Sequence, residues 1–315
     1  MNAPSGQPAG RPDNVPVNPV GQPGYTFREL WRLLHRSFVL AYKHNCLGVA
    51  KGVAYSALLS FLPAMTVMTT ILVQIQAAPV SQILFKALHQ VAPPGTEHLV
   101  YEHFRATGRR PATLLFGAAV ISLWAASGVI KSLMEGFRAA YDIQAPRSFV
   151  LHQGVSILLV VAAAIPGVGA SALVLFGARV EQHMLSAIGV IPAGAELKGW
   201  VLVAGRTLRY GLALGTVMLV TATIYYVAPN RRQRWRFVFP GAIVSTALWL
   251  GATAGFSWYV RHIADYNVLY GSIGAAIALL VWMYVQSLAA LIGCEFNAAC
   301  EARLSPSPRV PILEI

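Results

Sequence analysis

The sequence predicts an all-α protein that crosses a membrane as a bundle of six helices, and three observations support this prediction. Of the 315 residues, 56% are hydrophobic and only 11% are charged, whereas soluble proteins carry about 25% charged residues. Six runs stay apolar over about 20 residues, which is the length that crosses a bilayer as a helix. The runs are continuously apolar rather than alternating, which is not the pattern of strands in a membrane barrel.

The predicted spans occupy most of a domain at residues 25–300. Residues 1–24 are rich in Pro, Gly, Asn and Gln and contain no apolar run, so we expect a disordered tail rather than a cleaved signal peptide. Residues 301–315 contain three prolines and are expected to form a second disordered tail. The six spans are predicted at about 52–73, 112–130, 149–178, 210–228, 237–260 and 273–293.

The first span contains Pro63 in the stretch SALLSFLPAMTVM. Proline lacks an N–H donor and leaves the carbonyl of Leu59 without its usual helical partner, and hydrocarbon offers no water to replace that partner. We therefore expect a kink at Pro63, with the Ser60 hydroxyl as one candidate partner. Two interpretations stay open: a structural bend, or a bend that lines a cavity or moves during transport.

The third span is too long for a straight crossing, because about 30 residues of helix measure about 45 Å. The stretch IPGVG lies inside it, so we expect a kink or a break at Pro166. Spans four and five contain the GxxxG pairs Gly211/Gly215 and Gly251/Gly255. Such pairs let helices approach closely, so we expect both spans to contact a neighbour at these glycines.

Helices outside the spans are expected at the membrane surface. Residues 24–43 are basic and repeat apolar side chains at helical spacing, which predicts an amphipathic helix on the inner membrane surface. Residues 80–91 predict a second short helix in an outer loop, and residues 131–142 continue the second span. With the N-terminus inside, 15 of the 24 Lys and Arg residues lie on the inner side. This bias predicts that both termini are cytoplasmic.

Polar side chains in the sixth span form two stripes. Gln286 and Asn297 are eleven residues apart and share a helix face with Gly293, whereas Glu295 lies on a nearly opposite face. Glu295 lies near the inner interface, where it either pairs with a loop arginine or has a role linked to a substrate or a proton. Tyr270 belongs to a crowded outer loop, which is either held by its own ion pair or forms a mouth that meets a polar headgroup.

The sequence disfavours several other classes of function. The basic residues lie in short loops beside apolar runs, as membrane topology requires, so we expect no nucleic-acid partner. The densest acid and histidine cluster, EHLVYEH, places His98 and His103 on different helix faces and matches no metalloenzyme motif. We therefore expect no metal, no cofactor and no enzymatic activity, and free cysteines rather than disulfides.

Four stretches resemble the YihY/BrkB family of bacterial inner-membrane proteins. These are VAYSALLSFLPAM, LWAASGVIKSLMEGFRAAYDIQAPRSF, FPGAIVSTALWLGATAGFSWYV and YNVLYGSIGAAIALLVWMYVQSLAALIGCEFNAAC. The Tyr-Gly-Ser start and the Glu-x-Asn end of the last stretch are the most specific, and the matches together cover about residues 40–300. The chain departs from the family pattern at Lys51 and Gly52, where alanines are preferred, and at Cys294, which stands between Gly293 and Glu295.

The resemblance implies a six-span inner-membrane protein with cytoplasmic termini, and it supplies no established catalytic residues. Members of the family have carried the labels ribonuclease BN and virulence or serum-resistance factor, with suggestions of lipid or envelope-precursor transport. We expect a transporter or flippase for a lipid or cell-envelope component, with membrane lipids as partners. A non-transporting membrane scaffold is the alternative, and a ribonuclease is disfavoured. The candidate cavity or hinge residues are Tyr55, Ser60, Pro63, Pro166, Tyr270, Gln286, Glu295 and Asn297.

Overall fold

The computed structural model describes residues 27–74, 112–143, 147–187, 199–231, 233–262 and 272–304. This part of the chain contains seven helices and no strand, which confirms the predicted all-α class. Six of the helices are long and apolar enough to cross a membrane. The helices are α1 (Phe27–Lys43), α2 (Cys46–Gln74), α5 (Ala112–Ala140), α6 (Phe149–Ala187), α7 (Trp200–Val227), α8 (Trp235–His262) and α10 (Ser272–Leu304).

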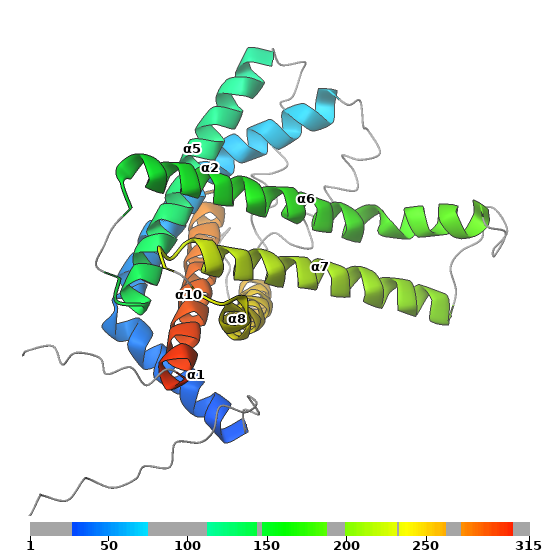
Figure 1. Ribbon diagram of the computed structural model, residues 1–315. Helices are drawn as coiled ribbons and strands as arrows, with labels where there is room; N and C mark the ends of the chain where they lie inside the picture. Colours follow the sequence, from blue (N-terminus) through cyan, green and yellow to red (C-terminus); the bar gives the residue numbers. More distant parts are fainter. Residues whose placement is uncertain are drawn as a thin grey trace, which may run out of the picture.

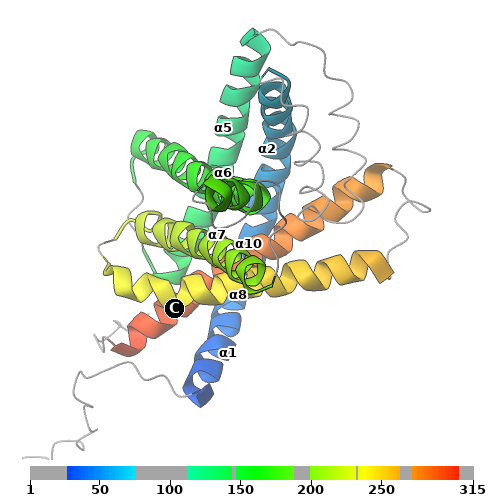
Figure 2. The same cartoon turned by 90° about the vertical axis from the view of Figure 1, so that its right-hand side faces the viewer.

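The six long helices pack as three pairs, α2 with α5, α6 with α7, and α8 with α10. We call the side where α2, α6 and α8 begin and α5, α7 and α10 end the termini side, and the opposite side the far side. The three pairs meet at the termini side and diverge toward the far side (Figures 1 and 2). Helix α10 joins its own pair to α2 and α5 and also packs against α1, whereas α6 and α7 are joined to the rest through α5 and α8.

The hydrophobic core lies mainly in the termini-side half of the bundle. The largest buried side chains there include Phe137 of α5, Leu159 of α6, Tyr225 of α7, Val238 of α8 and Leu291 of α10. On the far side, the described side chains of α6, α7 and α8 are partly or largely exposed. Membrane helices associate through close side-chain packing rather than through burial from water, so the termini-side half holds the bundle together.

Helix α1 is the amphipathic helix that the sequence predicted. Its buried residues Leu33, Ser37 and Ala41 recur every four residues, and Leu33 packs against α10 in a cluster with Phe296 and Cys300. Arg303 near the end of α10 donates to Glu29 of α1 at 2.6 Å. Both ends of the described chain therefore lie on the same side of the bundle.

The helices extend beyond the spans predicted for them. Helix α5 runs to Ala140, as expected from the prediction that residues 131–142 continue the second span, and Asp142 just after it adopts a positive φ of 52°. Helix α6 runs without interruption through Pro166, so the alternative of a break there is wrong; one proline removes one backbone hydrogen bond while the rest of the helix continues. Helix α2 also continues through Pro63. Helix α10 extends to Leu304, so residues 301–304 of the expected C-terminal tail at 301–315 are helical instead. The predicted tail at 1–24, residues 305–315 and the predicted helix at 80–91 lie outside the described residues.

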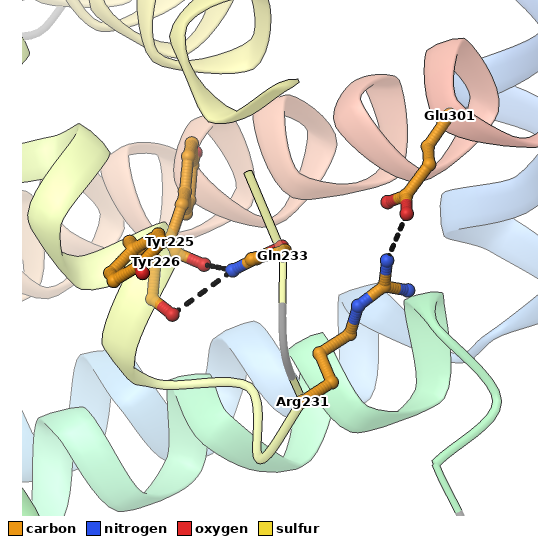
Figure 3. Close-up of polar contacts among 5 residues, drawn as sticks. All are labelled: Tyr225, Tyr226, Arg231, Gln233 and Glu301. Carbon is orange, nitrogen blue, oxygen red and sulfur yellow. Dashed lines mark hydrogen bonds and ion pairs between the residues drawn. The ribbon is translucent and has the colours of Figure 1, made fainter. Parts of the chain in front are cut away.

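Side chains bind the loops of the termini side to the helices. After α7, Gln233 donates to the carbonyl oxygens of Tyr225 and Tyr226 at 2.5 and 3.0 Å and so caps the helix end, while Arg231 pairs with Glu301 of α10 (Figure 3). Arg147 donates to the Val227 carbonyl at 2.8 Å. Helix ends leave carbonyls without partners, and these contacts supply the missing donors.

The two GxxxG pairs that predicted close helix packing do not pack closely against another helix. An added Cβ on Gly211, Gly215, Gly251 or Gly255 would meet nothing within 4 Å in the structure, and all four residues are exposed. The expected close contact at these glycines is therefore wrong. They lie toward the far side, where the helix pairs have already diverged, so a GxxxG face has no neighbour to approach.

Candidate functional site

A cavity of about 160 Å³ opens between α5, α7, α8 and α10. Leu133 and Phe137 of α5 and Trp249 of α8 form part of its apolar wall. Its polar wall consists of Thr221 and Tyr225 from α7, Ser245 and Thr246 from α8, and Gln286 from α10. The cavity thus combines an apolar lining with a few converging polar groups, which is the usual composition of a small-molecule site.

Two polar atoms of the cavity-lining residues have no hydrogen-bond partner in the described structure: Thr246 Oγ1 and Gln286 Oε1. Thr246 is 7% exposed. By contrast, Thr221 donates to the carbonyl of Val217 in its own helix at 2.9 Å, and Gln286 Nε2 donates to Thr253 Oγ1 of α8 at 2.9 Å. A buried polar group without a partner costs about 1–3 kcal/mol, so these two atoms are suited to bind a polar group that enters the cavity.

Helices α8 and α10 cross at Gly241 and Gly293. A Cβ on Gly293 would lie 2.5 Å from the Tyr225 hydroxyl and 2.7 Å from the Gly241 carbonyl oxygen, so the backbones meet without room for a side chain. Next to the crossing, Asn297 accepts from the Gly241 amide at 2.6 Å and donates to the Val238 carbonyl at 3.0 Å. Asn297 therefore holds the α8 backbone on both sides of Pro240, where proline weakens the helix.

The two polar stripes predicted for the sixth span point to different helices, as their spacing indicated. Gln286, Gly293 and Asn297 all contact α8. Glu295 lies on the other side of α10, and its Oε1 is 2.6 Å from Nδ1 of His44. His44 belongs to the turn between α1 and α2. Glu295 thus pairs with a histidine and not with the loop arginine considered from the sequence.

The candidate residues of the first span do not line the cavity. Tyr55 is 61% exposed, and Ser60 donates to the carbonyl of Ala57 in its own helix at 2.9 Å. Ser60 therefore does not serve the Leu59 carbonyl that Pro63 leaves free. Helix α2 instead packs against α5 through small residues, with Gly52 facing Ser132 and Ser56 facing Gly128.

The remaining candidates are distributed over the molecule. Pro166 lies inside α6, away from the residues that line the cavity, and Tyr270 lies outside the described residues. Of the eight candidates, Gln286 lines the cavity, and Asn297 holds the α8 and α10 crossing beside it. Glu295 forms a separate buried contact with His44.

Several residues of this region were not predicted from the sequence. Tyr225 is 1% exposed and donates to the Ala290 carbonyl of α10 at 2.5 Å, and it packs edge-to-face on Phe137 with ring centroids 5.3 Å apart. Thr246 was one of many hydroxyls in spans four and five and carried no distinguishing signal. Pro240 did carry one, because a Pro-Gly pair inside a span requires a compensating polar partner.

Across the helices that the structure describes, no group of three or more His, Cys, Asp and Glu side chains converges as metal ligands. The histidines of the EHLVYEH stretch lie outside the described residues. The described site is therefore built from hydroxyls, amides and apolar side chains.

The fold and the cavity together define a multi-pass helical membrane protein with a mainly apolar cavity that contains a few polar groups between its spans. The chain belongs to the virulence factor BrkB family, whose model matches residues 39–311. This match confirms the family that the four sequence stretches indicated. No solved structure matches the chain.

Curated relatives resemble most of the chain at low identity. "Putative ribonuclease-like protein YfkH" of Bacillus subtilis is 29% identical over 252 residues, which cover 79% of this chain and 88% of that protein. A UPF0761 membrane protein of Aeromonas salmonicida is 28% identical over 82% of this chain and 85% of that protein. A UPF0761 membrane protein of Alkalilimnicola ehrlichii is 24% identical over 81% of this chain, and the chain spans 55% of its length.

Proposed function

We propose that this protein moves a lipid or a cell-envelope component across the bacterial inner membrane and binds its polar part in the cavity between α5, α7, α8 and α10. The observation that carries the proposal is the pair of unpartnered atoms at this cavity, Thr246 Oγ1 and Gln286 Oε1. Polar groups are costly inside a membrane and mark functional positions. A headgroup with hydrogen-bond donors would satisfy both atoms.

The divergence of the helix pairs supports an amphiphilic substrate. Far-side side chains such as Val203 and Leu208 of α7 and Trp258 of α8 are 61%, 63% and 57% exposed. These apolar surfaces suit acyl chains, while the cavity suits a headgroup. Transporters commonly bind substrate near mid-membrane between helices that rearrange, and the close α8 and α10 crossing gives such a rearrangement a fixed point.

The proposed orientation has both termini in the cytoplasm. The contact of Glu29 with Arg303 supports termini on the same side, and the excess of Lys and Arg in the loops of that side supports the cytoplasmic assignment. The orientation is tested with the substitutions Lys43→Cys and Arg303→Cys, each labelled with a membrane-impermeant thiol reagent. Labelling of intact spheroplasts from outside at either position would contradict it.

The transport experiment uses the full chain in vesicles of phosphatidylethanolamine and phosphatidylglycerol. One arm carries a fluorescent phosphatidylethanolamine and the other a fluorescent isoprenyl-phosphate lipid, and dithionite quenching reports the label that remains inside. The test variant combines Thr246→Val with Gln286→Leu. Its matched control, Thr216→Val, changes a threonine that donates to the Leu212 carbonyl of its own helix and does not line the cavity.

We expect the wild-type chain and the control to move at least one of the two lipids. The cavity variant should move it at least tenfold more slowly, because it loses two hydrogen bonds to the headgroup at about 1 kcal/mol each and about 1.4 kcal/mol corresponds to tenfold. Equal rates for the cavity variant and the control would overturn the cavity as the binding site. Absence of movement in both arms, from a monodisperse and folded preparation, would refute transport of these lipids. A ribonuclease assay on the same preparation tests the activity named for the Bacillus subtilis relative.

A membrane scaffold is the second candidate function, and the surface of α1 supports it. Trp31 and Tyr42 are 64% and 75% exposed, and Arg32 and Arg36 are exposed beside them. A helix of this kind suits binding to a lipid surface or to a partner protein. The scaffold predicts that Trp31→Ala impairs envelope integrity in cells while the vesicle assay stays unchanged.

A further inference from the structure

Glu295 is a carboxyl group with no solvent exposure, placed in the termini-side half of α10. Its Oε1 lies 2.6 Å from His44 Nδ1 and 3.8 Å from Cys46 Sγ. Its Oε2 has no hydrogen-bond partner in the described structure. An isolated buried carboxylate costs several kcal/mol, so the charge of this group depends on its closest partner, His44.

A separation of 2.6 Å requires a proton between the nitrogen and the oxygen, because two lone pairs would repel each other at this distance. The pair has no net charge in two states: imidazolium with carboxylate, or neutral imidazole with carboxylic acid. Neutral imidazole with carboxylate leaves one negative charge on a group without exposure. The buried position therefore favours one of the two neutral states, which hold one proton more than the anionic state.

His44 connects this buried group to water. Its side chain is 32% exposed, and it lies in the turn between α1 and α2, where Asn45 has a positive φ of 54°. A proton from termini-side water can bind the imidazole, and the Nδ1 contact carries it to Glu295 Oε1. In that step an N–H bond breaks as an O–H bond forms, and no other reactant is required.

Among the residues that the structure describes, no other neighbouring group supplies a counter-charge to Glu295. Cys46 of α2 and Cys294 of α10 are the other titratable side chains that interact with it. Beyond Cys294, Arg231 is paired with Glu301 and lies 4.3 Å from the centre of the Tyr141 ring. Burial raises the pKa of Tyr141 well above its ordinary value, Cys294 adds to this and Arg231 opposes it, so Tyr141 stays neutral at physiological pH.

We propose that Glu295 and His44 form a proton-binding site that exchanges its proton with water on the termini side. The site joins the α1–α2 turn to α10. Two residues further along α10, Asn297 holds α8. The protonation state of the site therefore affects α10 close to its contact with α8. This inference does not rest on the transport proposal, because it concerns the proton alone.

The test is pH-difference infrared spectroscopy on the full chain in lipid nanodiscs, with glutamate labelled by carbon-13. We expect a carboxyl band that titrates in the wild-type chain and is lost in Glu295→Gln. It should remain in Glu135→Gln, a matched change at an exposed acid of α5. In His44→Gln the amide still donates to the carboxyl but cannot become cationic, so the Glu295 band should persist to higher pH than in the wild type.

Three outcomes would overturn the proposal. One is a titrating band that survives in Glu295→Gln, and another is a His44→Gln titration identical to that of the wild type. The third is one equivalent of zinc in the purified wild-type chain that is lost in Glu295→Gln, because His, Cys and Glu are zinc ligands. If Glu295→Gln does not fold, the comparison of the wild type with His44→Gln decides the question alone.

Discussion

The crossing of α8 and α10 predicts that Gly293→Ala destabilises the protein. The new Cβ would lie 2.5 Å from the Tyr225 hydroxyl, 2.6 Å from Ser245 Cβ and 2.7 Å from the Gly241 carbonyl oxygen. All three distances are well below van der Waals contact, and the obstructing atoms belong to two helices, α7 and α8. One of the obstructing atoms belongs to a backbone, so the neighbours cannot simply rotate away.

The expected magnitude follows from the cost of overpacking. An extra methyl group in a well-packed core costs about 1–3 kcal/mol. The matched control is Gly255→Ala in α8, where an added Cβ meets nothing within 4 Å in the structure. Because glycine disfavours a helix interior by about 0.5–1 kcal/mol relative to alanine, the control should be neutral or slightly stabilising. Gly293→Ala gains the same helix propensity, so the two variants should differ by the overpacking cost of about 1–3 kcal/mol.

The assay is unfolding of both variants in mixed micelles of mild detergent and dodecyl sulfate, followed by far-ultraviolet circular dichroism. Gly293→Ala should unfold at a lower fraction of dodecyl sulfate than the wild type, and Gly255→Ala at the same or a higher fraction. Equal midpoints for the two alanine variants would refute the tight crossing. A lower midpoint for Gly255→Ala than for Gly293→Ala would mean that α8 packs through its GxxxG face instead.

Three further predictions use the same unfolding assay. Asn297→Leu leaves the Gly241 amide and an α8 carbonyl without this partner, so it should cost about 2–6 kcal/mol at about 1–3 kcal/mol per orphaned group. A loss below that of a surface variant would contradict the role of Asn297. Tyr225→Phe removes the hydrogen bond to the α10 backbone and should cost about 1 kcal/mol, and an unchanged midpoint would show that the bond contributes nothing. The side chains of Glu29 and Arg303 are 27% and 48% exposed. A double-mutant cycle on this pair should therefore give a coupling energy below about 1 kcal/mol that falls with added salt. A larger coupling energy that does not depend on salt would disprove a solvent-screened pair.

Local properties of the chain were predictable from the sequence. Apolar length sets whether a helix crosses a bilayer, so the six spans and the amphipathic α1 could be identified without any tertiary information. Helical periodicity also placed Gln286 and Asn297 on one face of α10 and Glu295 on another. The helix ends were less predictable, because helices such as α6 continue beyond the hydrocarbon, and apolar composition does not report that extension.

The packing of one helix against another was not predictable, because a sequence motif describes the surface of one helix and does not show whether another helix packs against it. The GxxxG pairs of α7 and α8 are exposed, whereas the close crossing uses Gly241 and Gly293 with no GxxxG pattern. His44 and Glu295 are 251 residues apart in sequence, so no local pattern links them. By itself the sequence determined a six-span helical membrane protein with polar stripes on its last span. Only the tertiary structure decided which stripe meets α8, which meets His44, and where a cavity opens, because these depend on contacts between segments that are distant along the chain.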